Sequence, residues 1–598
     1  MVGEVFLHDA FCIFPMLDHI FRTKPLECFE NEEEKDQASR ELGLWGLIAV
    51  GICGTVGSGI FASTGDIISG AAGPAAFVSW MIAGLSCILS GFAYMEMSSI
   101  VPSSGSTYSF AYHALGELPA MIAAWLLTLE YGMSSAGVAR SWAQKVQEWA
   151  DESGGNFAWL NDVHFNLLAS AIMLLSVLVG LKGVHFGKLF INTVTVTKIG
   201  VVLFIILFGL WISTSSNFVP RHPRRFPPQA FFGFVGFDEV CYMATETRNP
   251  RTIMPRAVIG TILGTMFLSA FASLALSGML PYDIYAGGFV APYSFGGAFD
   301  YLGHTAAKLI VHIGEVGTMP VVVFISFLMQ PRLMHNLAMD GLAPEIFGRV
   351  DENGNLVWCT LLSGAFFILV TLLIPFSSLW NMITFGILVS FIMTNASLLL
   401  VRTREASPVT APRLTAAIVA LSGIAMFTLQ KGYIQASDDK SSTAILAMAI
   451  FSVALLFATT AIACSCPQNV GARDLFRAPL VPWVPTLAIT VNWFLVAQFD
   501  NADITNGCLW IGVGVVSYFL YGFKNSAGRR NWNLSQADLE IQMPRVMMRR
   551  STWSPMLSQD DAGLAEMTTL IKHSSTIAPD TPHRLRQKLS TERAPLLE

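Results

Sequence analysis

The sequence predicts an all-α polytopic membrane protein, and three observations lead to that fold class. Of the 598 residues, 53% are hydrophobic and only 13% are charged. The mean hydropathy is +0.53, whereas about a quarter of the residues of a soluble protein are charged. The lysines and arginines are also uneven, because they gather in short segments between apolar stretches and in the C-terminal part of the chain. The composition therefore excludes a soluble protein.

The apolar stretches give the order of the predicted helices, since a membrane-spanning helix needs about 20 apolar residues. About fourteen stretches meet this length. They lie at 44–66, 74–100, 117–140, 163–181, 189–213, 229–245, 256–279, 302–330, 356–374, 379–401, 413–429, 443–464, 480–499 and 505–523. An even number of spans places both termini on one side. More lysines and arginines fall in the loops on that side, so the termini are expected to be cytosolic.

Two of these spans, the first and the sixth, contain small residues that interrupt a helix. The first carries GTVGSGIF at 54–61, and the sixth carries FFGFVGFDEV at 231–240. Glycine costs a helix interior about 1 kcal/mol relative to alanine. If the first ten spans form two repeats of five, the interruptions occupy matching positions, which indicates a transport site near the middle of the membrane. The alternative role for these glycines is close helix packing.

An unwound segment at each interruption would offer backbone groups to a zwitterion such as an amino acid. Amide groups at the start of a half-helix favour an anion, and freed carbonyl groups in the sixth span would face an ammonium group. The predicted substrate-binding residues are Gly57, Ser58, Gly59, Phe232, Gly233, Val235 and Gly236.

Several longer stretches resemble the cationic amino acid transporter branch of the amino acid–polyamine–organocation superfamily. They include GSGIF, GVARSW, FVGFDEVCYMATETRNPRTIMPRAVIG and QPRLMHNLAMDGL, and the resemblance covers residues 40–525. The last block, FRAPLVPWVPTLAITVNWFLVAQF, is typical of the fourteen-span branch. The resemblance implies a leucine-transporter-type 5+5 inverted repeat with four extra C-terminal helices, which moves amino acids by alternating access.

This resemblance also implies a domain organisation. We expect a cytosolic N-terminal segment at 1–43 and a first repeat at 44–213. A second repeat is expected at 214–401, and peripheral helices at 402–523. The segment 524–598 mixes basic, serine and proline residues without periodicity, which predicts a disordered cytosolic tail.

Ionisable residues inside a span are functional candidates, because burying a charge in the membrane is costly. Lys198, in the fifth span, resembles the lysine of proton-coupled family members, whose amine takes the place of a sodium ion beside the first span. The alternative for Lys198 is a side chain that reaches back to the membrane surface. Glu130, in the third span, resembles a glutamate that lines the central cavity of relatives. It would take part in proton coupling or attract a cation, or be satisfied by a neighbouring helix.

Three further carboxylates are candidates for substrate selectivity. Asp238 matches the family pattern GFD, whereas Glu239 stands where the family usually has a small or apolar residue. An added carboxylate there would favour basic substrates by Coulomb attraction. The alternative is that Glu239 faces the cytosolic vestibule. Glu315 lies three residues from His312 on one helix face. These two residues would pair with each other or line the substrate cavity. Glu96, at the end of the second span, is expected to have an interfacial structural role.

The segment 219–230 departs from the family. It contains prolines at 220, 223, 227 and 228, which exclude a regular helix, and its arginines fall on the outer side. Either the outer half of the sixth span is altered, or the sequence is imperfect here.

A six-residue motif near the C-terminus bears on location. ERAPLL fits an acidic dileucine sorting signal through Glu592, Leu596 and Leu597. A sorting adaptor would bind these residues, and the protein would then reside in a lysosomal or vacuolar membrane rather than the plasma membrane.

The sequence therefore favours a transporter of cationic amino acids such as arginine, lysine or ornithine, coupled to protons. The alternatives are a transporter of neutral amino acids or polyamines, and an amino acid sensor that does not transport. No nucleophile–base constellation, metal-ligand spacing or phosphate-binding loop occurs in the sequence. We therefore expect no enzyme activity, no cofactor, no metal site and no nucleic-acid partner.

Overall fold

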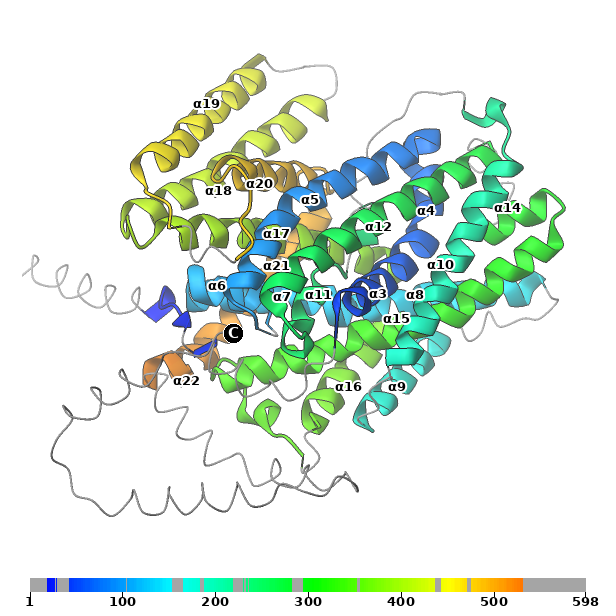
Figure 1. Cartoon of the computed structure of the whole chain (residues 1–598), viewed down its shortest axis with the longest axis horizontal. Helices are drawn as coiled ribbons and strands as arrows, with labels where there is room; N and C mark the ends of the chain where they lie inside the picture. Colours follow the sequence, from blue (N-terminus) through cyan, green and yellow to red (C-terminus); the bar gives the residue numbers. More distant parts are fainter. Residues whose placement is uncertain are drawn as a thin grey trace, which may run out of the picture. The chain divides into compact units, whose positions relative to one another are not determined.

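The computed structural model describes residues 19–26, 28–29, 42–103, 105–152, 165–182, 188–218, 230, 233–234, 236–281, 294–351, 355–435, 442–469 and 475–530. Within these ranges the chain is helical and forms no strand (Figure 1). Three parts lie outside the described residues: the segment 219–229, the loops at the remaining gaps, and the tail with its dileucine motif.

The helices of the first predicted repeat follow the expected apolar stretches. They are α3 (Leu44–Thr55), α4 (Phe61–Ile67), α5 (Ala76–Ile100), α6 (Thr107–Ala114), α7 (Glu117–Thr128), α8 (Ser134–Glu152), α9 (Leu167–Leu181) and α10 (Lys188–Trp211). The short helix α6 connects the second and third predicted spans. The third span consists of α7 and α8, which are joined by a π-helical turn at Leu129–Met133.

The rest of the chain continues this order. The helices of the second predicted repeat are α11 (Glu239–Tyr242), α12 (Pro250–Met279), α14 (Phe295–Tyr301), α15 (Thr305–Met339), α16 (Val357–Leu373) and α17 (Phe376–Thr403). The C-terminal helices are α18 (Thr410–Leu429), α19 (Ser442–Ser465), α20 (Trp483–Val496), α21 (Asn501–Ser517) and α22 (Phe523–Asn525). Helix α18 packs against α19 and α20, and α20 contacts α17 and α5 (Figure 1).

Length and hydropathy identify membrane spans among these helices. In the described part of the chain, 8 helices are long and apolar enough to cross a membrane, and α3, α9, α16 and α20 are shorter apolar helices. Their surfaces fit a lipid environment, because large apolar side chains such as Trp211 and Phe457 are 77% and 74% exposed. Small polar side chains are instead buried. They recur every four residues along α12, as Thr261, Thr265, Ser269, Ser273 and Ser277.

Three pairs of helices that are five spans apart in the predicted order pack along each other. Helix α5 packs along α12, α8 along α15, and α9 along α16. The first and fifth spans differ: α3 packs mainly against α12 and α10 and only to a small extent against α11, and α10 packs against α12 and α15. Glycines permit the close approach of α5 to α12: Gly84 lies against Met266, and Gly91 lies against Ile262.

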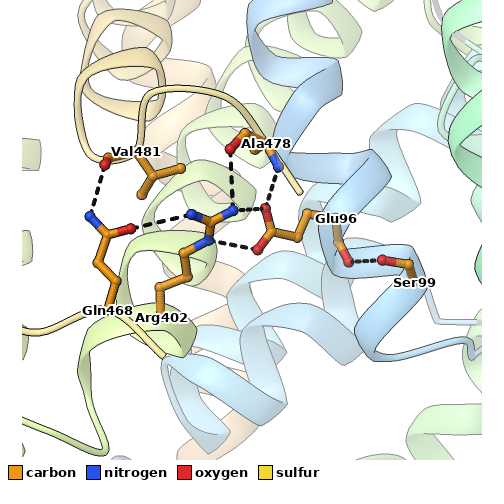
Figure 2. Close-up of polar contacts among 6 residues, drawn as sticks. All are labelled: Glu96, Ser99, Arg402, Gln468, Ala478 and Val481. Carbon is orange, nitrogen blue, oxygen red and sulfur yellow. Dashed lines mark hydrogen bonds and ion pairs between the residues drawn. The ribbon is translucent and has the colours of Figure 1, made fainter. Parts of the chain in front are cut away.

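A buried ion pair joins α5 to α17 and to the segment before α20 (Figure 2). Arg402 donates from Nε to Glu96 Oε1 at 2.7 Å and from Nη2 to Glu96 Oε2 at 2.6 Å. The Ala478 amide also donates to Glu96 Oε2, at 2.6 Å. Gln468 accepts a bond from Arg402 Nη1 at 3.2 Å and donates to the Val481 carbonyl at 2.8 Å. Glu96 thus links three distant segments, and its position at the membrane interface stays a prediction.

A second buried ion pair gathers both terminal segments around the end of α15. Lys24 Nζ lies 2.9 Å from Asp340 Oδ1. The Tyr108 hydroxyl donates to Asp340 Oδ2 at 2.5 Å, and the Ala527 amide donates to the Asp340 carbonyl at 2.9 Å. Arg22 also bonds the Gly528 carbonyl. We call this group, made of Arg22, Lys24, Tyr108, Asp340 and residues 527–528, the terminal clasp.

Candidate functional site

The interruption of the first span takes the form of a π-helical turn at Val56–Ile60, between α3 and α4. The sequence predicts an unwound segment here, and the structure differs. A π-turn widens the helix and keeps its backbone bonded from residue i to i+5, which avoids the cost of unpaired amides in an apolar setting. The Ser63 hydroxyl donates to the Gly59 carbonyl at 2.6 Å. The side chain of Ser58 lies outside the described part of the structure.

The sixth span is interrupted more strongly. Gly233 and Phe234 form part of a tight turn, and Gly236 has a φ of 114°, which a residue with a side chain rarely adopts. Helix α11 then covers only Glu239–Tyr242 and passes into a 3₁₀ turn at Met243–Glu246. Two predicted binding residues, Phe232 and Val235, lie outside the described residues.

The two interruptions meet through their glycines. A Cβ added at Gly59 would lie 2.1 Å from the Gly233 Cα, and one added at Gly236 would lie 3.3 Å from the Gly54 carbonyl carbon. Gly233 also lies beneath Trp80, since a Cβ there would be 2.2 Å from the indole ring. These glycines therefore permit close packing, which was the simpler of their two predicted roles. A ligand between Gly59 and Gly233 would require the two spans to separate.

Three carboxyl groups are buried beside this glycine contact: Glu130, Asp238 and Glu239. Glu130 lies in the π-turn between α7 and α8, and its carboxyl group faces that of Asp238. The Tyr131 hydroxyl donates to Asp238 Oδ2 at 3.1 Å. This arrangement brings the third and sixth spans together through polar side chains.

Glu239, the third of these carboxyl groups, contacts α15 and α3. Its Oε1 accepts a bond from the Ser326 hydroxyl of α15 at 3.1 Å. Its Oε2 lies against Gly54 of α3, where an added Cβ would be 2.8 Å away. Among the described residues, Glu239 Oε2 has no hydrogen-bond partner. Glu239 is therefore a buried carboxyl group with one oxygen aimed at the first span.

Lys198 approaches the same turn of α3. Its Nζ lies 2.8 Å from the Cys53 carbonyl oxygen and 3.6 Å from the Cys53 Sγ. The side chain is fully buried, so it does not reach the membrane surface. Because Cys53 and Gly54 are consecutive, Lys198 and Glu239 both contact the last turn of α3 before the π-turn.

Glu315 and His312 belong to a different region of α15. The His312 ring stacks on Trp149 of α8, with ring centroids 6.2 Å apart, and lies against Gly296 of α14. Glu315 is 11 residues before Ser326, the contact of Glu239, or about 16 Å along a helix. The structure therefore does not bring Glu315 to the other carboxyl groups.

Sequence reasoning missed two residues that support the site and one that joins α8 to the end of α16. Tyr131 and Ser326 supply the hydroxyl groups to Asp238 and Glu239, but a single hydroxyl in an apolar stretch carries no signal. Arg140, within the motif GVARSW, donates to the Thr371 and Leu372 carbonyls at 2.6 and 2.8 Å. A cation is favoured at the C-terminal end of a helix such as α16.

The described residues contain no group of three His, Cys, Asp or Glu side chains that could hold a metal ion.

Paired helices, two opposed interruptions and buried charges define a multi-pass membrane protein of the transporter class. Residues 42–459 match the amino acid permease family, and residues 476–526 match the C-terminal region of the same permeases. The chain belongs to the amino acid permease family.

Three relatives illustrate the range of this family. A methylthioribose transporter of Bacillus subtilis is 28% identical over 525 residues, covering 85% of this chain and 99% of the relative. Cationic amino acid transporter 4 of Mus musculus is 25% identical over 594 residues, covering 87% and 92%. The branched-chain amino acid permease BcaP of Bacillus subtilis is 26% identical over 536 residues, covering 86% and 99%.

Proposed function

We propose that this permease is a secondary active transporter of amino acids, with a preference for cationic ones and coupling to protons. The observation that carries the proposal is the meeting of two interrupted spans beside buried Lys198, Glu130, Asp238 and Glu239. Backbone groups at the interruptions would bind the ammonium and carboxylate groups that all amino acids share. The surrounding charges would select the side chain and carry the proton.

Alternating access follows from the same contact. The pairing of spans five positions apart supports two inverted repeats in a leucine-transporter-type fold, with α18 to α21 as peripheral helices. Separation of Gly59 from Gly233 would admit the substrate to Gly57, Ser58 and Gly59 on one side. On the other side, Phe232, Gly233, Val235 and Gly236 would complete the site.

The proposed orientation places both termini in the cytosol, on the side where more loop lysines and arginines lie. Residence in the plasma membrane or in a lysosomal or vacuolar membrane is consistent with this orientation. An adaptor that binds Glu592, Leu596 and Leu597 would direct the protein to the latter.

A neutral amino acid is the second candidate substrate. The relative named for branched-chain amino acids is as similar to this chain as the relative named for cationic ones, at 26% and 25% identity. Uptake of radiolabelled arginine and alanine into proteoliposomes, with and without an acid-outside pH gradient, tests the proposal. Accumulation of arginine that collapses with a protonophore supports it. Absence of uptake of both, from folded protein that still binds one of them, contradicts transport and favours a sensor.

Lys198 is the proposed proton-coupling residue, because its amine is buried against the Cys53 carbonyl at 2.8 Å. We predict that Lys198→Ala abolishes uptake driven by a pH gradient, while exchange of internal for external substrate persists. Both rates are measured in the same proteoliposomes. An unchanged response to the gradient would remove Lys198 from the coupling mechanism.

Glu239 is the proposed selectivity residue, because Glu239 Oε2 is buried without a hydrogen-bond partner among the described residues. We predict that Glu239→Ala weakens competition by arginine more than competition by alanine, measured as the inhibition of labelled substrate uptake. Equal losses for the two competitors would exclude this role.

A further inference from the structure

Three cationic side chains gather at the terminal clasp without an acidic partner. Arg22 belongs to the N-terminal segment, and Lys524 and Arg529 follow the last long helix, α21. Lys524 and Arg529 are exposed, and Arg22 is half-buried. Within the described part of the chain, none of the three forms an ion pair. We call these three residues the cationic cluster.

The ring of Phe523 joins the two arginines, which come from opposite ends of the described chain. The Arg529 guanidinium group lies over this ring, with Cζ 5.0 Å from the centroid. His19 packs edge-on against the same ring, with centroids 5.9 Å apart, and Arg22 Nη2 lies 2.8 Å from His19 Nδ1. Arg22 Nη1 also donates to the Gly528 carbonyl. An aromatic ring and the backbone therefore hold the arginines in place, and carboxylates do not.

The buried carboxylates of this region are engaged elsewhere. Asp340 binds Lys24 at 2.9 Å. Glu117 accepts bonds from the Tyr518 hydroxyl at 3.0 Å and from the Ser526 hydroxyl at 2.6 Å. Because neither carboxylate forms an ion pair with the cationic cluster, the cluster is open to an anion from outside the described structure.

The cationic cluster lies at the end of a membrane span. The last candidate span covers Asn501–Arg529, so Lys524 and Arg529 belong to its final residues. Large apolar side chains are exposed beside the cluster, namely Leu520, one turn before Lys524, and Phe21, next to Arg22. Exposed apolar side chains at a span end face lipid tails, and cations at such an end lie at the depth of the lipid headgroups.

From this arrangement we infer that the cationic cluster binds the phosphate headgroup of an anionic lipid. Guanidinium groups bind phosphate through two parallel hydrogen bonds, and a lysine acts as a point charge. Arg22 and Arg529 hold the phosphate, and Lys524 adds its charge. The bound lipid bridges the N-terminal segment and the last span, which stabilises the terminal clasp. Free phosphate has the same charged group, but Phe21 and Leu520 favour a molecule with acyl chains. The inference is independent of the substrate that the permease carries.

Phosphatidylserine and phosphatidylcholine with identical acyl chains provide a matched test, because they differ in net charge. Each lipid is added to the purified protein in detergent, and native mass spectrometry measures the lipid that the protein retains. We expect several-fold stronger retention of phosphatidylserine. The double variant Lys524→Gln and Arg529→Gln should lower this retention several-fold. The control double variant, Lys182→Gln and Arg256→Gln, removes two exposed cations at the ends of α9 and α12 and should leave retention unchanged.

A second measurement needs no variant and remains decisive if the double variant does not fold. The unmodified protein is placed in nanodiscs of phosphatidylcholine, with or without phosphatidylserine, and treated with trypsin. Phosphatidylserine should slow cleavage after Arg22 several-fold, because the lipid covers its side chain. Cleavage after Lys182 in the same samples is the internal control and should not change. An equal rate after Arg22 in the two membranes would overturn the inference.

The remaining outcomes identify other occupants of the cationic cluster. Equal retention of the two lipids, or an equal loss in the variant and its control, overturns the inference. Inorganic phosphate that raises the melting temperature as much as phosphatidylserine does also overturns it, because the acyl chains then contribute nothing. Retention that appears only after Glu32, Glu33 and Glu34 are replaced by glutamine contradicts it too, since this acidic stretch of the chain then occupies the cluster.

Discussion

At Gly233, the packing admits a hydrogen atom and nothing larger. A Cβ there would lie 2.2 Å from the Trp80 ring and 3.3 Å from the Gly59 Cα. Trp80 is itself fully buried and packs against Phe234, with ring centroids 6.0 Å apart. The indole ring therefore cannot move aside without disturbing its neighbours.

We predict that Gly233→Ala lowers the free energy of unfolding by about 1–3 kcal/mol, the usual cost of overpacking a core, and slows transport. The melting temperature in detergent and substrate uptake are the two measurements. Gly200→Ala is the control, since no atom lies within 4 Å of the added methyl group in α10. Alanine there should leave stability unchanged or raise it by about 1 kcal/mol. A stable, active Gly233→Ala protein would show that the two spans do not pack this closely.

Residues of the candidate site could be predicted only where a charged side chain stands in an apolar stretch of sequence. Lys198, Glu130, Asp238 and Glu239 are charged residues in apolar stretches, and the structure buries all four. Glu239 lies against Gly54, and Lys198 bonds to the adjacent Cys53 carbonyl. Glu315 stands out in the sequence equally well but lies elsewhere, because the sequence does not say at which depth a side chain meets its neighbours. Whether these residues couple protons or select substrates stays a prediction.

Between elements, the ion pair of Glu96 and Arg402 fixes helices that are distant in sequence (Figure 2). Both charged groups are buried, with side chains 4% and 7% exposed. Their oxygens and nitrogens are satisfied by the backbone of Ala478 and the amide of Gln468. The network therefore joins α5, α17 and the segment before α20, which anchors the C-terminal helices to the core.

We predict that Glu96→Gln and Arg402→Gln each lower the free energy of unfolding by about 3–5 kcal/mol, because each leaves an unpaired buried charge. The double variant should cost less than the sum of the two, which a double-mutant cycle measures. The control is Lys308→Gln, which removes a pair with Asp300 at 3.1 Å, where Asp300 is 49% exposed. That change should cost about 0–1 kcal/mol. Additive effects of the Glu96 and Arg402 changes would argue against direct coupling.

Element types and their order follow from the sequence more fully than their contacts do. Apolar stretches predicted the helices, and two glycine-rich stretches predicted the interrupted ones. The prediction that the first interruption is unwound was wrong, because a π-turn keeps the backbone amides and carbonyls hydrogen-bonded within the helix. The pairing of Glu96 with Arg402 was not predicted, since the two residues are 306 positions apart and no local pattern links them.

At the scale of the whole described chain, the terminal clasp joins the segment before α3, helix α6, the end of α15 and the 3₁₀ turn Ala527–Arg530 that follows α22. Asp340 bonds to three of these parts through Lys24, Tyr108 and Ala527. The sequence predicted a cytosolic segment at 1–43 and did not predict that part of it is docked. Segments outside the spans lack the apolar periodicity on which helix prediction depends.

We predict that Asp340→Asn speeds tryptic cleavage after Arg22 at least several-fold, because Lys24 loses a buried ion pair and the segment opens more often. The rate is measured by mass spectrometry of the folded protein in detergent. Asp351→Asn, which changes an exposed carboxylate beyond the same helix, should leave the rate unchanged. A similar rate in all three proteins would mean that the ion pair does not hold the segment.

The terminal clasp also has a consequence for biosynthesis. Lys24 leaves the ribosome long before Asp340, and Ala527 follows only after the last helix has been made. The complete clasp therefore cannot form before Ala527 has been made, by which time every helix between its parts has been synthesised. A chain that ends between Asp340 and Ala527 can still form the Lys24–Asp340 ion pair, but its Asp340 carbonyl lacks the Ala527 amide. That unpaired carbonyl distinguishes an unfinished molecule from a complete one.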